Sequence, residues 1–478
     1  MDADPLQTAL HLFRTGDPAA ARPIFARVQR ANPTEAQPAF FLGACDLKLG
    51  NPASAAPMLL RATALPRPPV QAWLYLAMAR QQMGADNWRE PLTRAERALP
   101  ASLLVEVARC WLAGGQRQRA EQLLEHRVPM DVRSDLLRAR LARRDADGSA
   151  VVRYASRAFQ SAQTPADRIH VMTELGVGLD MVGRYSEAWE VFEARNQQRW
   201  TRHGLPPDVY PNHVQHLLAW WRAHDTLPAA APDDGGPTPH FLVGFPRSGT
   251  TLTEQCLTGH PSVRSLDEKP WLVSLFAAIE QERGWSFPKD LHRLTPDDWQ
   301  RLRDQYRATT GLRAHEFLLD KLPLNWVNLP LIRCLFPRSR VVVVLRDPRD
   351  ACISGLMQAF DHNVSMIQFL QPERVGALYN SVRALGERFT QIPGLHGSRV
   401  WYHDLVSDQE STLRTLLDAL GLPWHPGVLR PDRAASNRYI STPSRDQVCR
   451  PVHTRSVGRW RNYPQVVERL GVDRWVHD

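Results

Sequence analysis

The stretch HFLVGFPRSGTT, residues 240–251, decides the fold of the C-terminal half of this chain. An aliphatic run leads directly into two glycines five residues apart, Gly244 and Gly249, and two hydroxyl residues follow, Thr250 and Thr251. This is the frame of a Walker A loop, in which backbone N–H groups at the start of a helix bind phosphate oxygens. The stretch therefore predicts an α/β domain with an anion site between its first strand and its first helix.

The lysine of a Walker A loop is missing from this stretch. Thr250 stands at the lysine position, and an arginine, Arg247, stands three residues earlier. In nucleoside-triphosphate enzymes that lysine reaches the β- and γ-phosphates, so its absence disfavours a kinase or an ATPase. A 5′-phosphate alone needs no such reach. A glycine turn without a ligand is the alternative, and the strand before and helix after the loop disfavour it.

Short aliphatic runs that alternate with helical stretches follow the loop. They predict strands over residues 240–245, 317–319, 340–345 and 399–402. Such alternation is typical of a parallel sheet with helices on both faces, whose ligands bind at the carboxyl ends of the strands. We therefore expect one α/β domain over residues 240–478.

The N-terminal part of the chain repeats with a period of 34 residues. Gly16, Gly50 and Gly84 fall at that interval, which is the tetratricopeptide period, with two antiparallel helices in each repeat. The same step relates Ala21 to Ala55, Phe25 to Leu59, Val28 to Ala62 and Pro66 to Pro100. A further copy covers 175–192, and the register between them is looser. Residues 1–205 are thus predicted to form tetratricopeptide-like helical repeats, with a plain helical bundle as the alternative.

A closing helix and a linker are predicted over residues 206–239. Apolar residues recur at helical spacing over 208–223, and TLPAAAPDDGGPTP at 226–239 is rich in Pro, Gly and Asp. Two domains are also the default for 478 residues, because single domains usually split above ~250–300 residues. The predicted fold class is a multidomain chain, all-α tetratricopeptide-like helical repeats followed by an α/β P-loop-like domain with a parallel sheet.

Composition narrows the setting in which the chain works. The 43% hydrophobic and 23% charged residues are typical of a soluble globular protein, and residues 1–12 lack a signal-peptide pattern. The longest aliphatic run, 341–345, is far shorter than the ~20 residues that span a bilayer. We expect a cytoplasmic protein without a membrane span. Its net charge of +9 favours polyanionic ligands, but no nucleic-acid-binding motif is present, so no nucleic-acid partner is expected.

The six cysteines lie far apart and form no CxxC pair, which argues against a zinc site and against a disulfide framework. We expect reduced thiols and no metal.

A second segment, VLRDPRDACIS at 344–354, follows the most aliphatic run. Arg346 stands at the predicted end of that strand and Ser354 on the following helix, so the two can converge on one anion. Taken alone, the segment could be a salt-bridged turn. Combined with the glycine loop, it is a much more specific signal for a phosphate-bearing ligand.

The sequence PRSGTTL at 246–252 resembles the 5′-phosphosulfate-binding loop of sulfotransferases, particularly of the tyrosylprotein branch. The resemblance runs from about Phe241 to Arg461 through five ordered segments. It implies a co-substrate, 3′-phosphoadenosine-5′-phosphosulfate (PAPS), a hydroxyl-bearing acceptor and no metal. It also implies that Arg346 and Ser354 bind the 3′-phosphate. The loop residues that it assigns to the donor are Pro246, Arg247, Ser248, Gly249, Thr250 and Thr251.

The same resemblance assigns four further residues. Lys321, after the strand 317–319, matches a lysine that contacts the transferring group, and Ser444 in TPSRDQVCRPV matches a serine that assists transfer. Tyr402 in WYHDL matches a nucleotide-contacting tyrosine. Arg459 takes the place of a cofactor-binding lysine, which keeps the charge but changes the geometry.

The acceptor hydroxyl needs a base. Glu268 in HPSVRSLDEKP, 260–270, matches the glutamate base of the tyrosylprotein branch, and the neighbouring Asp267 is an alternative. Small-molecule sulfotransferases use a histidine, for which His260 and His315 are the fallback candidates.

The predicted function is sulfuryl transfer, with a tyrosine of a peptide or protein as the expected acceptor, because the concave surface of repeats suits extended peptides. A glycan, a lipid or a small phenol is the alternative acceptor. A P-loop kinase-like phosphotransferase is opposed by Thr250, and a non-catalytic repeat scaffold by the joint presence of Glu268, Lys321 and Ser444. The repeats are expected to bind the acceptor, and a homo-oligomer is a further possible arrangement.

Overall fold

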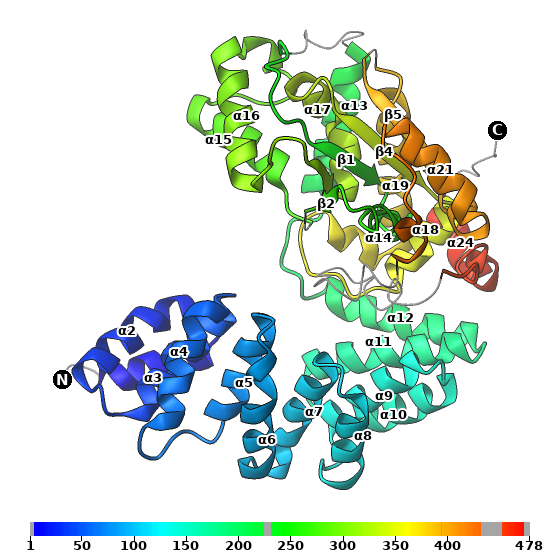
Figure 1. Ribbon diagram of the computed structural model, residues 1–478. Coiled ribbons are helices and arrows are strands. Elements are labelled where there is room, and N and C mark those ends of the chain that lie inside the picture. The colour runs from blue at the N-terminus through cyan, green and yellow to red at the C-terminus, as the bar shows by residue number, and fades with distance from the viewer. Residues whose placement is uncertain (1–3, 224–230, 267, 393, 432–451, 473–478) are drawn as a thin grey trace. The chain divides into compact units, whose positions relative to one another are not determined.

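The computed structural model describes residues 4–223, 231–266, 268–392, 394–431 and 452–472 (Figure 1). Two compact units make up the chain, Met1–Asp167 and Arg168–Asp478. The first is built of helices, and the second contains both helices and a parallel sheet (Figure 1). The predicted combination of helical repeats with a parallel α/β domain is confirmed.

Successive helices pack as pairs in the first unit. Gly16, Gly50 and Gly84 all have a positive φ and end the first helix of a pair, as the 34-residue period predicts. The second helix of the first pair starts where Asp17 caps it by accepting from the backbone N–H of Ala20 at 2.9 Å. The helices are α1 (Pro5–Arg14), α2 (Pro18–Ala31), α3 (Ala36–Lys48), α4 (Pro52–Ala64), α5 (Ala72–Gln82), α6 (Arg89–Ala98), α7 (Leu104–Ala113), α8 (Arg117–His126), α9 (Val132–Arg144) and α10 (Gly148–Ser161).

The looser register of the repeats after residue 100 results from a shorter repeat period. Gly115 and Ala146 occupy the turns after α7 and α9 with φ of 75° and 59°, and each follows the preceding turn by 31 residues. The helix pairs therefore continue through this stretch. The glycine pattern is lost because the period changes and because alanine takes one left-handed turn position.

Three helices precede the sheet, α11 (Pro165–Met181), α12 (Tyr185–Trp200) and α13 (Val209–Ala223), and the second unit begins at Arg168, within α11. The repeat pattern assigned residues up to 205 to the N-terminal domain, whereas the packing of the chain divides at residue 167. The repeat pattern predicts the helical hairpin α11–α12, which is present. The pattern does not predict which part of the chain the hairpin packs against.

The predicted linker is held in place where it is described. Arg303 of α16 (Pro296–Thr310) donates to the carbonyl oxygens of Ala231 at 3.2 Å and Pro232 at 2.6 Å. One helical turn later, Arg307 binds the carboxylate of Asp234 through both of its terminal nitrogens. Residues 231–239 are therefore fixed to α16.

The sheet has five parallel strands in the order β2-β3-β1-β4-β5. They are β1 (His240–Gly244), β2 (Val263–Ser265), β3 (Phe317–Lys321), β4 (Arg340–Leu345) and β5 (His396–Trp401). The central strand β1 pairs with β3 on one side and β4 on the other, so the carboxyl ends of these three strands meet at one edge of the sheet. Strand β2 was not predicted, because its three residues, Val-Arg-Ser, carry one aliphatic side chain.

Both faces of the sheet are apolar and covered (Figure 1). Leu242 of β1 packs with Val342 of β4 and with Leu257 of α14 (Thr250–Leu257) on one face. On the other face, Phe241 of β1 lies against Tyr306, at 6.5 Å between ring centroids. Burial on both faces is typical of a parallel sheet. The other α-helices in the described part of this unit are α15 (Trp271–Arg283), α17 (Leu329–Leu335), α18 (Pro348–Leu356), α19 (Pro372–Phe389), α20 (Tyr402–Ser407), α21 (Gln409–Ala419) and α24 (Pro464–Leu470).

Within the described ranges, no helix has the length and apolarity to cross a membrane, and no group of three His, Cys, Asp or Glu side chains is placed to hold a metal ion. The described cysteines are buried and have free thiols. Cys449 lies outside the described residues.

Candidate active site

The loop between β1 and α14 depends on its two glycines. A Cβ atom at Gly244 would lie 2.5 Å from the carbonyl oxygen of Val344, and one at Gly249 would lie 2.5 Å from Cδ2 of Tyr402. Gly249 also has a φ of 104°, in the left-handed region that suits glycine. Helix α14 starts at the next residue, so its first backbone N–H groups have no partner within the helix. The loop is built for an anion at the helix N-terminus.

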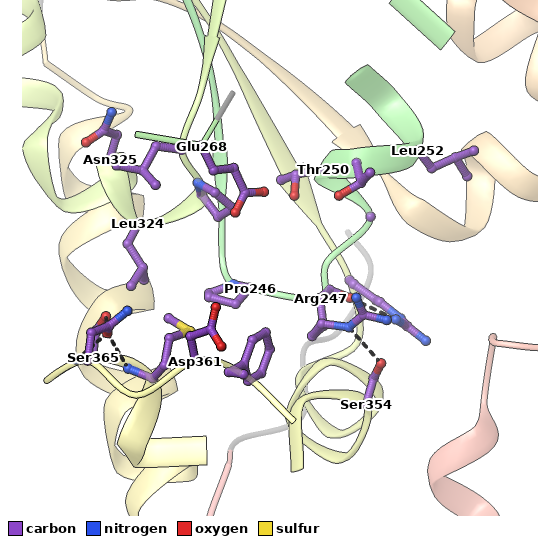
Figure 2. Close-up of a pocket in the computed structure, with 18 of the residues that line it drawn as sticks. Pro246, Arg247, Thr250, Leu252, Glu268, Leu324, Asn325, Ser354, Asp361 and Ser365 are labelled. Atoms are coloured by element: carbon purple, nitrogen blue, oxygen red, sulfur yellow. Dashed lines mark hydrogen bonds between the residues drawn. The ribbon is translucent and has the colours of Figure 1, made fainter. Parts of the chain in front are cut away.

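The two predicted anion-binding segments meet at Arg247. Its Nε donates to the hydroxyl of Ser354 at 3.2 Å, and its carbonyl oxygen accepts from Nη1 of Arg346 at 2.8 Å. Burial and the neighbouring charge of Arg346 lower the pKa of Arg247 to about 10. Residues about 100 positions apart in the sequence therefore form one electropositive corner (Figure 2).

Arg346 keeps one donor without a partner in the described part of the chain. Its Nη2 donates to the carbonyl oxygen of Ser456 at 2.5 Å, and its guanidinium lies over the ring of Tyr402, 4.6 Å from the centroid. Its Nε is buried and has no hydrogen-bond partner among the residues that the structure describes. Because leaving a buried donor unpaired is costly, an anionic ligand fits this position.

The turn that carries Arg459 is fixed from helix α18. Asp350 accepts hydrogen bonds from the backbone N–H groups of Gly458 at 2.7 Å and Trp460 at 2.9 Å, on either side of Arg459. Asp350 and Ser354 are four residues apart and share one face of α18, and Arg346 lies just before the start of that helix. The role of Asp350 was not predicted, because an acidic residue at that spacing is compatible with an ordinary helix cap.

A cavity of about 790 Å³ opens at the carboxyl ends of the strands. Its walls include most of the residues predicted for the donor and for catalysis, Pro246, Arg247, Gly249, Thr250, Thr251, Glu268, Arg346, Ser354, Tyr402 and Arg459. Ser248 and Lys321 are buried and are not part of this wall. Ser444 and Asp267 lie outside the described residues. Figure 2 shows Arg247 and Ser354 at one side of the cavity and Glu268, Leu324 and Asn325 around the rest.

The far wall of the cavity was not predicted. It includes Tyr210 of α13, Val273 of α15, Leu324 of the 3₁₀ turn Pro323–Asn328, and the segment 359–366 after α18. Within that segment, Asp361 carries a carboxylate toward the cavity (Figure 2). No short motif marks these residues, because they come together from four separate elements.

Lys321 lies between two carboxylates. Its Nζ is 3.1 Å from Oε2 of Glu254 and also contacts Oε1 of Glu268. Burial acts to lower the pKa of Lys321, but the charges of Glu254 and Glu268 outweigh it, and the pKa is raised. The ammonium thus fixes the carboxylate of Glu268 at the cavity wall.

Glu254 is the member of this group that sequence reasoning missed. It is buried on α14, and its other oxygen, Oε1, accepts from the hydroxyl of Ser265 at 2.6 Å. The available signal was an acidic residue on a helix that follows a phosphate loop, one turn after Thr250.

The fallback histidines lie away from the cavity. The ring of His260 is buried, with Nε2 3.1 Å from the carbonyl oxygen of Pro423, and its Nδ1 accepts from the N–H of Ser262. Burial lowers the pKa of His260. His315 lines a separate hollow next to Phe317, at the start of β3.

Residues 239–426 match the profile of a family described as the Sulfotransferase family. The matched residues include the phosphate loop 244–251 and the segment 344–354. An uncharacterized protein of Aquifex aeolicus is 31% identical over 235 residues, and Protein-tyrosine sulfotransferase 1 of Danio rerio is 25% identical over 236 residues. These alignments cover 47% and 46% of this chain, but 30% and 64% of the relatives. This chain therefore spans less than two thirds of either relative.

Among solved structures, part of this chain is similar to the sulfotransferase domain of the Synechococcus PCC 7002 olefin synthase. The alignment covers 51% of this chain and 98% of that domain, with 21% identity and a TM-score of 0.37.

Proposed function

We propose that the protein transfers a sulfuryl group from PAPS to a hydroxyl acceptor. The observation that carries this proposal is the meeting of Arg247, Arg346 and Ser354 beside a phosphate loop that lacks the Walker lysine. Two arginines and a hydroxyl suit a nucleotide with a second phosphate, away from the one that the helix N-terminus binds. The match of residues 239–426 to the Sulfotransferase family profile supports the same donor.

In the proposed reaction, the acceptor oxygen attacks the sulfur while the bond from sulfur to the bridging phosphate oxygen breaks. The hydroxyl proton passes to the carboxylate of Glu268, and the leaving group is adenosine 3′,5′-bisphosphate. Little covalent help is needed, because positioning and the stabilisation of developing charge provide most of the acceleration in such transfers. Arg247 and Arg346 of the electropositive corner stabilise the negative charge on the departing phosphate.

Lys321 has an indirect part in this proposal. In the structure its ammonium is engaged by Glu254 and Glu268 behind the cavity wall. Its first effect is therefore to hold the base in place. Contact with the bridging oxygen would require Lys321 to exchange one of these carboxylates for the donor.

We further propose a phenolic acceptor, a tyrosine of a peptide or protein. The far wall offers an aromatic and apolar surface from Tyr210, Val273, Leu324, Phe360 and Met366 next to Glu268. Such a surface suits a flat ring whose hydroxyl must reach a carboxylate. A relative whose printed name is Protein-tyrosine sulfotransferase 1 is consistent with this choice. Glycans, lipids and small phenols are the competing acceptors.

Calorimetry tests the donor. Adenosine 3′,5′-bisphosphate should bind well, and adenosine 5′-monophosphate more weakly, because it lacks the 3′-phosphate assigned to Arg346 and Ser354. Tight ATP binding with phosphate transfer, and no binding of the bisphosphate, would exclude a sulfotransferase. Incubation with ³⁵S-labelled donor and a cell extract then identifies the acceptor, and a labelled glycan or lipid without labelled protein would exclude the tyrosine.

A further inference from the structure

The helical hairpin α11–α12 contacts both ends of the cavity, although the sequence assigned it to the repeats. All of its contacts described below lie within the second compact unit. They involve two different sets of side chains, one on each helix.

On the donor side, Asp180 of α11 holds Arg459. The Nε of Arg459 donates to Oδ1 of Asp180 at 3.2 Å, and its Nη2 donates to Oδ2 at 2.6 Å. The phenol of Tyr463 also donates to Oδ1 of Asp180. A two-point bond of this kind uses one edge of the guanidinium fork and leaves both N–H groups of Nη1 on the opposite edge for another acceptor.

On the other side, Arg195 of α12 is fully buried and donates to backbone carbonyl oxygens at the C-terminal end of α18 and just after it. Its Nη2 reaches Leu356 at 2.7 Å and Gln358 at 3.1 Å, and its Nη1 reaches Met357 at 2.9 Å. A cation at a helix C-terminus satisfies carbonyl groups that have no partner within the helix. The segment held in this way continues into residues 359–366, which form the far wall of the cavity.

Charge explains why Arg459 needs such a partner. Arg346 and Arg459 both act to lower the pKa of Arg247, so three cations gather at the donor end before any anion binds. Burial lowers the pKa of Arg459, but Asp180 outweighs it and the pKa is raised. Without Asp180, repulsion and side-chain entropy would both favour a position of Arg459 away from the cavity.

We propose that Asp180 is a positioning residue for donor binding, and that the hairpin α11–α12 is thereby a working part of the active site. The proposal rests on the proposed function, because it takes the donor to be a bisphosphate nucleotide. Asp180 acts through Arg459 and does not touch the reacting atoms.

A double-mutant cycle on the full chain tests this proposal, with calorimetric binding of adenosine 3′,5′-bisphosphate as the readout. Asp180→Asn and Arg459→Gln should each weaken binding on the order of tenfold, as expected for one charge-assisted hydrogen bond. The double variant should bind no worse than Arg459→Gln alone, because Asp180 works only through that side chain. In turnover assays, Asp180→Asn should raise the donor KM and leave the acceptor KM unchanged.

Glu193→Gln is the matched control. Glu193 lies on α12 and binds Arg469 of α24 at 2.5 Å, so it also links the hairpin to the C-terminal segment, but it does not line the cavity. It should bind the bisphosphate like the wild type. Tyr463→Phe removes only the hydroxyl that holds Asp180 and should weaken binding about threefold.

Each outcome has a defined meaning. If the wild type does not bind the bisphosphate, the proposed function fails and this proposal fails with it. If the wild type binds and Asp180→Asn binds equally well, or if Asp180→Asn weakens binding further in the Arg459→Gln background, only the positioning role is overturned. Should Asp180→Asn fail to fold, unchanged binding by Tyr463→Phe overturns it, and weakened binding supports it.

Discussion

The two carboxylates that flank Lys321 should respond very differently to the same substitution. Glu254 is buried, and its two oxygens are bonded to Lys321 and to Ser265. Glu268 is 29% exposed and lines the cavity. We expect Glu254→Gln to lower stability with little effect on donor binding, and Glu268→Gln to lower turnover strongly with little effect on stability.

The size of the first effect follows from burial. Glutamine at position 254 can keep its bond with Ser265, but it then turns an amide N–H toward the ammonium of Lys321, where the carboxylate now accepts. Removing one partner of a buried ion pair costs about 3–5 kcal/mol, and the low end applies because Lys321 keeps Glu268. For a unit of roughly 300 residues, about 3 kcal/mol corresponds to a fall in Tm of about 5 °C.

The second effect is chemical. Water can replace the lost charge at Glu268, so the stability cost should stay below about 1 kcal/mol. Loss of a positioned base should lower kcat on the order of 10²-fold or more, while affinity for the bisphosphate changes little. Scanning calorimetry and single-turnover transfer measure the two quantities on the same preparations. A Tm for Glu254→Gln within about 1 °C of the wild type, or a larger fall for Glu268→Gln, would refute this reasoning. Inactivation by Asp267→Asn but not by Glu268→Gln would place the base one residue earlier.

Three further predictions concern the loop, the sheet and the hairpin. Gly249→Ala should weaken bisphosphate binding at least tenfold by calorimetry, because its Cβ would lie 2.5 Å from the ring of Tyr402; wild-type affinity would contradict this. Burial raises the pKa of Asp320 to about 6 from 3.8, so the folded state holds a proton that the unfolded state loses, and stability falls as pH rises from about 4 to about 6. Asp320→Asn should therefore raise Tm at about pH 7.5 and leave it nearly unchanged below about pH 4, and equal shifts at both would contradict the assignment. A truncated protein that starts before α11, near residue 164, should be soluble and bind the bisphosphate, whereas one that starts near Pro237 should aggregate or bind weakly, because it lacks Asp180 and Arg195. Comparable binding by both proteins would show that the hairpin is dispensable.

The loop and the sheet could be predicted because their signals are local. A strand, a glycine turn and a helix within twelve residues fix the place of the anion site, and a second strand end brings Arg346 and Ser354 to the same edge. The local sequence pattern did not predict β2, because a single aliphatic residue does not distinguish a strand from a loop. It also missed Glu254, because a buried acidic residue on a helix looks like an exposed one until Lys321 is placed opposite it.

The repeat pattern could predict helices but not their partners. Shared spacing put Gly183 and Phe192 in a further repeat, and the hairpin α11–α12 is present with Phe192 buried against Gly176. What the hairpin packs on depends on Arg195 and Asp180, which are ordinary polar residues in a helical pattern. Their partners lie about 160 and 280 residues further along the chain, beyond the reach of any local signal.

The charges around the cavity are ordered in the direction of the proposed transfer. Arg247, Arg346 and Arg459 collect at the donor end, where a nucleotide with two phosphate groups would neutralise them, and Glu268 stands where a hydroxyl must lose its proton. Such a cluster of cations repels itself when no donor is bound, so some permanent negative charge must lie behind it. Asp180 supplies that charge from a helix of the repeat type. The second compact unit begins at Arg168, within α11, and not at β1, so it includes Asp180 together with the arginine cluster.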